Sequence, residues 1–122
     1  MFLSPAAISG RRCLGRYGGL VTVYAIAQLS IHDRARYDRY MAAFMPVFAR
    51  YGGRLLAADE HPGVVEGQWS GDKVVLLEFP DRDTYTAWAS SPEYQGIAKD
   101  RLAAAETVVL LVRGLAEPTA SS

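Results

Sequence analysis

The sequence has few of the residues that build metal centres and disulfide frameworks. Its 122 residues include one cysteine, Cys13, and two histidines, His32 and His61. A single cysteine excludes a disulfide within the chain and favours a reducing compartment. These three residues also lack the spacing of a zinc or iron site, and no Walker loop, dinucleotide fingerprint or nucleophile elbow is present. We therefore expect neither a metal nor a cofactor.

The sequence also lacks an excess of charge and a long apolar run. It has 13 basic and 13 acidic residues, and no cluster of Lys or Arg forms the basic face that nucleic-acid binding requires. No apolar stretch approaches the roughly 20 residues of a bilayer-spanning helix. These absences predict a cytoplasmic protein that binds neither nucleic acid nor a membrane.

The first 20 residues differ in composition from the rest. They contain Arg11, Arg12 and Arg16 but no acidic residue. An Arg-rich, acid-free leader is typical of an organelle transit peptide, and the alternative is a disordered extension before the true start of the chain. We predict that residues 1–20 are disordered and that residues 21–115 form one domain. Residues 116–122 are predicted to be a disordered tail.

Half of the residues are hydrophobic, and three stretches are apolar at both odd and even positions. These stretches are residues 21–29, 74–79 and 107–112. Successive side chains of a strand point to opposite faces, so strands of this kind need cover on both faces. The rest of the chain offers helices for about one face. A second copy of the chain is the simplest cover for the other face, which predicts a homodimer.

An amphipathic helix is expected after the first strand. Apolar residues recur at spacings of three and four between Tyr37 and Tyr51, which is the pattern of one helix face. Asp33 suits the N-cap position, and Gly52-Gly53 suits the end of the helix. Pro46 falls inside this pattern, and we expect it to kink the helix without breaking it.

The remaining elements complete a recognisable order. Residues 54–59 and 64–69 are expected to be extended, as one irregular strand or a small hairpin, and residues 73–79 to form the next strand. A second helical region follows from Pro80, with a fresh helix start at Ser91-Pro92. With the last strand this is β-α-β-β-α-β, an α+β ferredoxin-like sandwich with an antiparallel sheet and both helices on one face.

Several short motifs occur in an order that resembles the DUF1330 family. They are Tyr37-x-x-Tyr40, Gly52-Gly53-Arg54, Glu66-Gly67, Glu78-Phe79-Pro80, Trp88 and Ser91-Pro92-Glu93-Tyr94-Gln95. The resemblance implies a dimeric α+β barrel, in which two ferredoxin-like sheets pack face to face. Proteins of similar architecture include antibiotic-biosynthesis monooxygenases, stress-responsive barrel proteins and small lactone isomerases, which use the space beneath the sheet. A likeness of fold does not assign a reaction.

Glu78 and Glu66 are the candidate catalytic residues. Glu78 interrupts an apolar strand, and a carboxylate held among apolar groups suits acid–base chemistry. Glu66 precedes Gly67, where the missing side chain lets another group come close. For each glutamate the alternative is a structural ion pair.

Five residues are candidates for ligand binding: Arg101, Arg54, Tyr40, Trp88 and Tyr94. Arg101 follows Ile97 by one turn, on the inner face of the last helix, where its guanidinium could clamp a carboxylate. The alternative is that Arg101 neutralises one of the two glutamates. Arg54 has the same two interpretations. The three aromatic residues are expected in the core, where a tyrosine hydroxyl needs a partner and can line a pocket.

Two functional hypotheses follow from these residues. In the first, each protomer holds a small, carboxylate-bearing and partly aromatic molecule between sheet and helices. Cofactor-free acid–base turnover, of the oxygenase or isomerase kind, is a narrower form of this hypothesis. In the second, the barrel is filled with side chains, the acids and Arg101 close into ion pairs, and the dimer is a structural or accessory module.

Overall fold

The computed structural model describes residues 21–115. The predictions for residues 1–20 and 116–122 lie outside this range. The strands are β1 (Val23–Ile31), β2 (Arg54–Asp59), β3 (Lys73–Phe79) and β4 (Ala105–Arg113). The helices are α2 (Arg34–Phe48), the short 3-10 helix η2 (Ala49–Tyr51), α3 (Arg82–Ala89) and α4 (Pro92–Ala104). No helix within residues 21–115 is long and apolar enough to cross a membrane.

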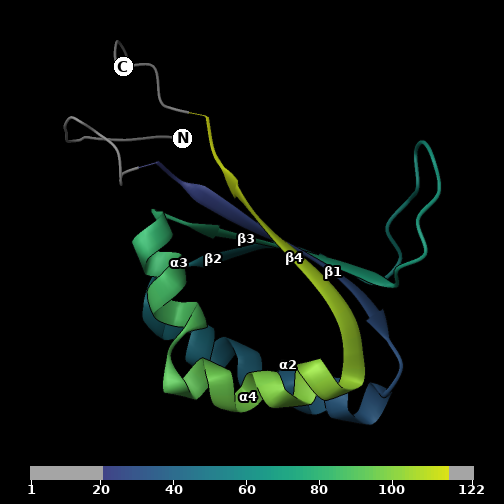
Figure 1. Ribbon diagram of the computed structural model, residues 1–122, viewed down its shortest axis with the longest axis horizontal. Coiled ribbons are helices and arrows are strands. Elements are labelled where there is room, and N and C mark those ends of the chain that lie inside the picture. Colours follow the sequence, from purple (N-terminus) through teal and green to yellow (C-terminus); the bar gives the residue numbers. More distant parts are fainter. Residues whose placement is uncertain (1–20, 116–122) are drawn as a thin grey trace.

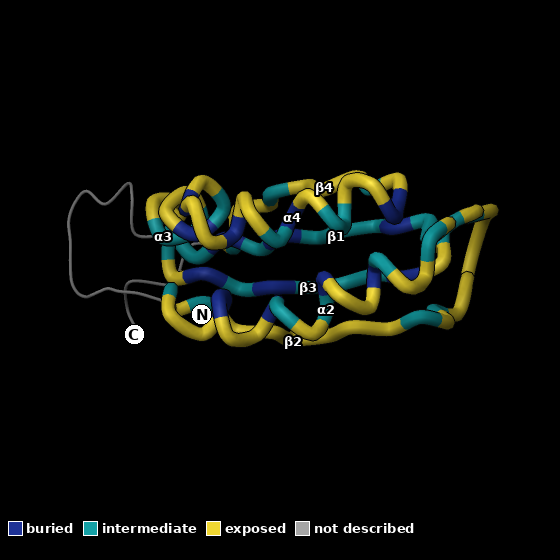
Figure 2. Tube along the Cα trace, turned by 90° about the horizontal axis from the view of Figure 1, so that it is seen from below, coloured by how far each residue is buried: buried dark blue, intermediate teal, exposed yellow. Residues whose placement is uncertain are grey.

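The strands form one sheet, and all the helices lie on one side of it (Figure 1). The strand order is β2-β3-β1-β4, and each neighbouring pair is antiparallel. This is the predicted ferredoxin-like arrangement, so the α+β prediction is confirmed. The view from the helix side shows buried and half-buried residues along the central strands β1 and β3, and exposed residues along the edge strands β2 and β4 (Figure 2).

The register of the strands decides which residues the helices cover. In β1, Val23, Ala25 and Leu29 are buried on the helix side. The alternate positions face outward, and on β4 the outward-facing Val108 and Leu110 are 56% and 47% exposed. The strands are thus apolar on both faces, as predicted, and the helices cover one face.

Helix boundaries follow the capping residues expected from the sequence. The Asp33 carboxylate accepts a hydrogen bond from the Arg36 backbone N–H at 3.2 Å, and the Ser91 hydroxyl accepts one from the Tyr94 N–H at 3.1 Å. Helix α2 runs through Pro46 without a break.

The double glycine after η2 serves two different needs. Gly52 ends the helical segment in the left-handed conformation, with φ of 78°. A Cβ atom on Gly53 would lie 2.7 Å from the Phe48 ring and 2.8 Å from the Phe79 ring, so only glycine lets the start of β2 approach these two core residues.

The connection between β2 and β3 differs from the prediction. Residues 64–69 form no strand, and the whole segment from residue 60 to residue 72 is an irregular loop. Pro62 cannot donate to a strand ladder, and Gly67 has φ of 87°, which no regular strand contains. The loop projects from the sheet on the side away from the helices (Figure 1).

Candidate functional site

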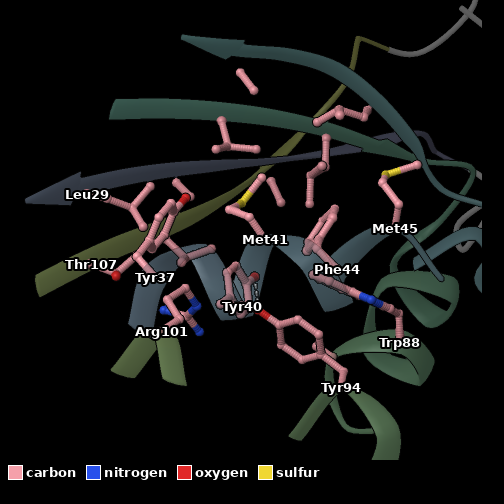
Figure 3. Close-up of a pocket in the computed structure, with 18 of the residues that line it drawn as sticks. Leu29, Tyr37, Tyr40, Met41, Phe44, Met45, Trp88, Tyr94, Arg101 and Thr107 are labelled. Carbon is pink, nitrogen blue, oxygen red and sulfur yellow. Dashed lines mark hydrogen bonds between the residues drawn. The ribbon is translucent and has the colours of Figure 1, made fainter. Parts of the chain in front are cut away.

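A cavity of about 250 Å³ lies between the sheet and the helices. Its floor includes Ala25 and Ala27 of β1 and Ala58 of β2, whose short side chains leave space that larger residues would fill. Met41 and Met45 point from α2 toward this floor (Figure 3). The volume is close to the lower end of ligand pockets, about 300 Å³, and therefore suits a small molecule.

The cavity reaches solvent at the edges of the sheet. Met45 of α2 and Leu55 of β2 both line it and are 45% and 42% exposed. On the opposite edge, Val109 of β4 also lines the cavity and is 44% exposed. A ligand could therefore enter between α2 and β2, or between the helices and β4, without unfolding of the core.

Aromatic rings form much of the helix-side wall. The Trp88 and Tyr94 rings lie 4.1 Å apart between centroids, and Phe44 meets the Trp88 ring edge-on at 6.0 Å. Tyr40 meets Tyr94 in the same edge-on manner at 6.2 Å. Ring faces and edges of this kind favour an aromatic or otherwise flat ligand.

Two tyrosine hydroxyls meet at one end of this wall. The Tyr40 and Tyr94 oxygens are 2.8 Å apart and buried, and the two share one hydrogen bond (Figure 3). Burial raises the pKa of Tyr40 far above its usual range, and the neighbouring Tyr94 adds to this effect. One hydroxyl proton of the pair is shared between the two oxygens. The second proton is the one that can be donated to a ligand oxygen.

Arg101 lies beside this hydroxyl pair. Its guanidinium carbon is 5.7 Å from the centroid of the Tyr40 ring, a cation–π distance. Burial acts to lower the pKa of Arg101, but Tyr94 and Tyr40 act in the opposite direction and the net pKa is raised. No carboxylate in residues 21–115 lies within 4.0 Å of its nitrogens. A guanidinium group without an acidic partner among the described residues, in a largely apolar cavity, is suited to bind a carboxylate or another oxyanion.

Two further polar groups among the lining residues have no hydrogen-bond partner within residues 21–115. The Trp88 indole N–H and the Thr107 hydroxyl are both buried without a hydrogen bond to any described residue. Buried polar atoms of this kind are exceptions in folded proteins. Both are carried by residues of the cavity wall, so the wall has hydrogen-bonding capacity that its own residues do not use.

The other predicted site residues lie outside the cavity. Glu78 faces away from the helices and accepts a hydrogen bond from the Arg54 guanidinium at 2.9 Å, across β2 and β3. Glu66 is exposed in the 60–72 loop. The structure thus brings together Arg101, Tyr40, Trp88 and Tyr94, and separates them from Glu78, Glu66 and Arg54. Within residues 21–115 of the protomer, Arg101 forms an ion pair with neither glutamate.

Sequence reasoning did not single out two of the cavity residues. Tyr37 belongs to the helix stripe and to the Tyr37-x-x-Tyr40 motif but is not among the predicted site residues, although it lines the cavity one turn before Tyr40. Thr107 was assigned only to the last strand. The sequence does contain a signal for it: Thr107 bears a hydroxyl at the same parity as Val109 and Leu111, in the otherwise apolar stretch 107–112.

The fold and the site define a class: a small ferredoxin-like α+β protein with an aromatic-lined cavity beneath its sheet and a cationic group in the wall. The chain belongs to the DUF1330 family, described as a domain of unknown function, whose sequence model matches residues 22–115. The family resemblance drawn from the motifs is therefore confirmed. Among curated proteins, none matches this chain.

Solved structures of similar fold share little sequence with this chain. The RPA0582 protein of unknown function from Rhodopseudomonas palustris is 19% identical, with a TM-score of 0.69, covering 81% of this chain and 85% of that one. A dimeric ferredoxin-like protein of unknown function from Thermobifida fusca is 14% identical, with a TM-score of 0.60 and coverage of 80% and 95%. SnoaB, a cofactor-independent oxygenase from Streptomyces nogalater, is 15% identical, with a TM-score of 0.55 and coverage of 84% and 99%. At these identities the likeness establishes the fold alone.

Proposed function

We propose that each protomer binds a small, partly aromatic organic anion in the cavity between the sheet and the helices. The observation that carries this proposal is the position of Arg101, a half-buried cation without an acidic partner in residues 21–115, beside the Tyr40–Tyr94 hydroxyl pair. The guanidinium supplies charge and paired donors for a carboxylate, the hydroxyl pair supplies one further donor, and the aromatic wall covers the apolar part of the ligand. The cavity itself is a feature that a filled barrel would lack.

The same proposal includes a homodimer formed through the outward face of the sheet. Val108, Leu110 and Val112 of β4 are each more than 40% exposed there, in a row with apolar residues of β1 and β3. Contiguous exposed apolar surface of this kind marks association sites. The 60–72 loop projects on the same side, with Val65 98% exposed, and can reach a second copy. The Thermobifida fusca protein of similar fold is described as dimeric.

Turnover of the bound molecule is a narrower form of the proposal. The Arg101 guanidinium and the free tyrosine proton would also stabilise an enolate or phenolate oxygen, the charge that develops in cofactor-free isomerisation or oxygenation. SnoaB, described as a cofactor-independent oxygenase, has a similar fold and supports this form by analogy. Catalytic roles for Glu78 and Glu66 remain predictions. Since neither lines this cavity, we assign proton donation within it to Tyr40 and Tyr94.

A calorimetric titration with 4-methylbenzoate tests the binding proposal. This probe combines a carboxylate with a small apolar ring, and 4-methylbenzamide is its neutral match. We expect the acid to bind and the amide to bind more weakly. Arg101→Gln should reduce affinity for the acid by at least about tenfold, because a hydrogen bond to a charged group contributes roughly 1.5–3 kcal/mol and about 1.4 kcal/mol is a factor of ten.

Arg54→Gln is the matched control for this titration. It removes the same type of charge from the opposite face of the sheet, where Arg54 is 73% exposed and pairs with Glu78. Affinity for 4-methylbenzoate should be unchanged in this variant. Equal losses in the two variants, or the absence of binding to the unmodified protein, would refute the proposal and favour a filled, structural dimer.

A further inference from the structure

A third tyrosine hydroxyl of the cavity wall, that of Tyr37, has no part in the anion site. Tyr37 lies on α2, lines the cavity and is 1% exposed. Its side chain points from α2 toward the sheet, whereas the Tyr40 hydroxyl, one helical turn later, meets Tyr94 of α4 (Figure 3). The two tyrosines of α2 thus direct their hydroxyls to different sides, one toward the sheet and one toward α4.

The Tyr37 hydroxyl is the unpaired one of these groups. It makes no hydrogen bond within residues 21–115, whereas the hydroxyls of Tyr40 and Tyr94 are bonded to each other. It is also not one of the enclosed polar atoms of the wall, which belong to Trp88 and Thr107. A buried tyrosine hydroxyl usually has a hydrogen-bond partner. A molecule bound in the cavity can supply that partner.

The Tyr37 ring is held in place by contacts on several sides. The Lys73 nitrogen lies 4.8 Å from the ring centroid, and the Arg34 guanidinium carbon lies 5.8 Å from it. The centroid of the Tyr40 ring is also 5.8 Å away. These contacts fix the direction of the hydroxyl before a ligand arrives, which reduces the entropy cost of binding.

The Tyr37 hydroxyl retains its proton at neutral pH. Burial raises the pKa of Tyr37 to about 12, and Glu60 adds to the rise. Arg34 and Arg101 act in the opposite direction without reversing the shift. A protonated phenol is both a hydrogen-bond donor and an acceptor, so it can bind a hydroxyl or a carbonyl oxygen.

We propose that Tyr37 is a specificity-determining residue, which binds a second oxygen of the ligand, a hydroxyl or carbonyl oxygen separated from the carboxylate by the ring. The inference rests on the proposed function, in which Arg101 holds the carboxylate beside the Tyr40–Tyr94 pair. The Tyr37 hydroxyl lies on the sheet side instead. The geometry therefore favours an aromatic acid with its second oxygen at position 3 or 4 of the ring over one with the oxygen next to the carboxylate.

Calorimetric titration of benzoate and its 2-, 3- and 4-hydroxy derivatives tests the inference. We expect the 3- or the 4-hydroxy acid to bind roughly threefold to tenfold more tightly than benzoate, the effect of one added hydrogen bond. 2-Hydroxybenzoate should show no such gain. Equal affinities for all four acids, or an equal gain for 2-hydroxybenzoate, would overturn the inference, and the unmodified protein answers both points without any variant.

Tyr37→Phe removes the hydroxyl and leaves the ring. It should abolish the gain of the hydroxy acid while the affinity for benzoate changes by less than about twofold. Tyr51→Phe is the matched control, because the Tyr51 hydroxyl donates to Glu93 at 3.2 Å and Tyr51 is not a lining residue. The gain should persist in this control. A gain that survives in Tyr37→Phe, or that disappears equally in both variants, would overturn the inference.

Failure of this inference can be told apart from failure of the proposed function. Benzoate binding that weakens in Arg101→Gln, with no gain from a hydroxyl, would refute the role of Tyr37 and leave the anion site standing. A gain that depends on Tyr37, with benzoate affinity unchanged in Arg101→Gln, would support the role of Tyr37 and refute the anion site. Absence of binding by all four acids would refute both proposals.

Discussion

The two faces of the sheet are built from the same strands, but one leaves apolar residues exposed and the other leaves polar groups without partners. On the outward face, two pairs of polar side chains are hydrogen-bonded to each other: Arg54 with Glu78 at 2.9 Å, and the Trp69 indole N–H with the Gln28 amide oxygen at 3.1 Å. Apolar residues such as Leu110 remain exposed there. The exposed apolar residues of this face can be buried by a second protein surface.

The helix-covered face shows the reverse. Its central apolar residues are buried, with Phe79 at 0% and Tyr37 at 1% exposure. Its polar groups are the unsatisfied ones: Arg101 has no acidic partner in residues 21–115, and the Trp88 N–H and Thr107 hydroxyl have no hydrogen bond there. An apolar cavity whose few polar groups lack partners is suited to bind a small ligand with a polar head group. One alternating sequence thus produces a protein-binding face and a ligand-binding face.

Introducing a charge on the outward face should have the largest effect. Leu110→Lys would bury an ammonium group in the proposed interface, and the effective cost of burying an ion is several kcal/mol. We expect analytical ultracentrifugation to show a dimer for the unmodified protein and a folded monomer for this variant. Leu102→Lys, on the exposed surface of α4 (65% exposed), is the matched control and should remain dimeric. A monomer in all three samples would refute the proposal that the outward face forms a dimer interface.

Truncating the core of the helix-covered face should come next. Phe79 is fully buried and contacts the Phe48 and Trp88 rings, with centroids 5.7 and 5.5 Å away. Phe79→Ala should lower the free energy of unfolding by about 3–5 kcal/mol, through lost burial and a new cavity. Urea denaturation measures this loss. Leu102→Ala, at an exposed position, should change stability by less than about 0.5 kcal/mol, and a similar loss in both would contradict the difference between covered and exposed positions.

High pH should weaken the helix-covered face through its tyrosines. Burial raises the pKa of Tyr37 to about 12, whereas a free tyrosine has a pKa of about 10. As pH rises past about 10, the unfolded state loses this proton before the folded state does, so the stabilisation is complete below pH 10 and is lost up to about pH 12. Denaturation curves across this range should show a smaller decline in Tyr37→Phe than in the unmodified protein. An equal decline in both would show that Tyr37 does not contribute to the loss of stability at high pH.

Removing the outward ion pair should have the smallest effect. Arg54 is 73% exposed on the edge strand β2, at the border of the outward face, and an ion pair that stays in contact with solvent contributes up to about 1 kcal/mol. Glu78→Gln should therefore reduce stability by less than about 1 kcal/mol and leave affinity for 4-methylbenzoate unchanged. A marked loss of affinity would instead support the predicted catalytic or binding role of Glu78.

The sequence was sufficient for the fold because its signals are local and periodic. The stripe from Tyr37 to Tyr51, the cap at Ser91 and the glycines at 52 and 53 each specify an element without tertiary information. The prediction for the 60–72 loop was partly wrong. Val64, Val65 and Trp69 suit a strand, but whether a segment pairs as a strand depends on the rest of the sheet, and residues 64–69 have no strand partner.

Only part of the site could be predicted from the sequence. Arg101 could be placed, since it follows Ile97 by one helical turn. Glu78 could not be placed on a face, because its strand is apolar at both parities and the pattern does not show which parity meets the helices.

The most direct test uses the two tryptophans, which lie on opposite faces. Trp88 lines the cavity, and Trp69 is hydrogen-bonded to Gln28 on the outward side. In Trp69→Phe the remaining indole reports on the cavity, and in Trp88→Phe it reports on the outward face. We predict that titration with 4-methylbenzoate changes the Trp88 emission in a saturable manner and leaves the Trp69 emission unchanged. A saturable change in Trp69 without one in Trp88 would contradict the assignment of the ligand to the helix-covered face.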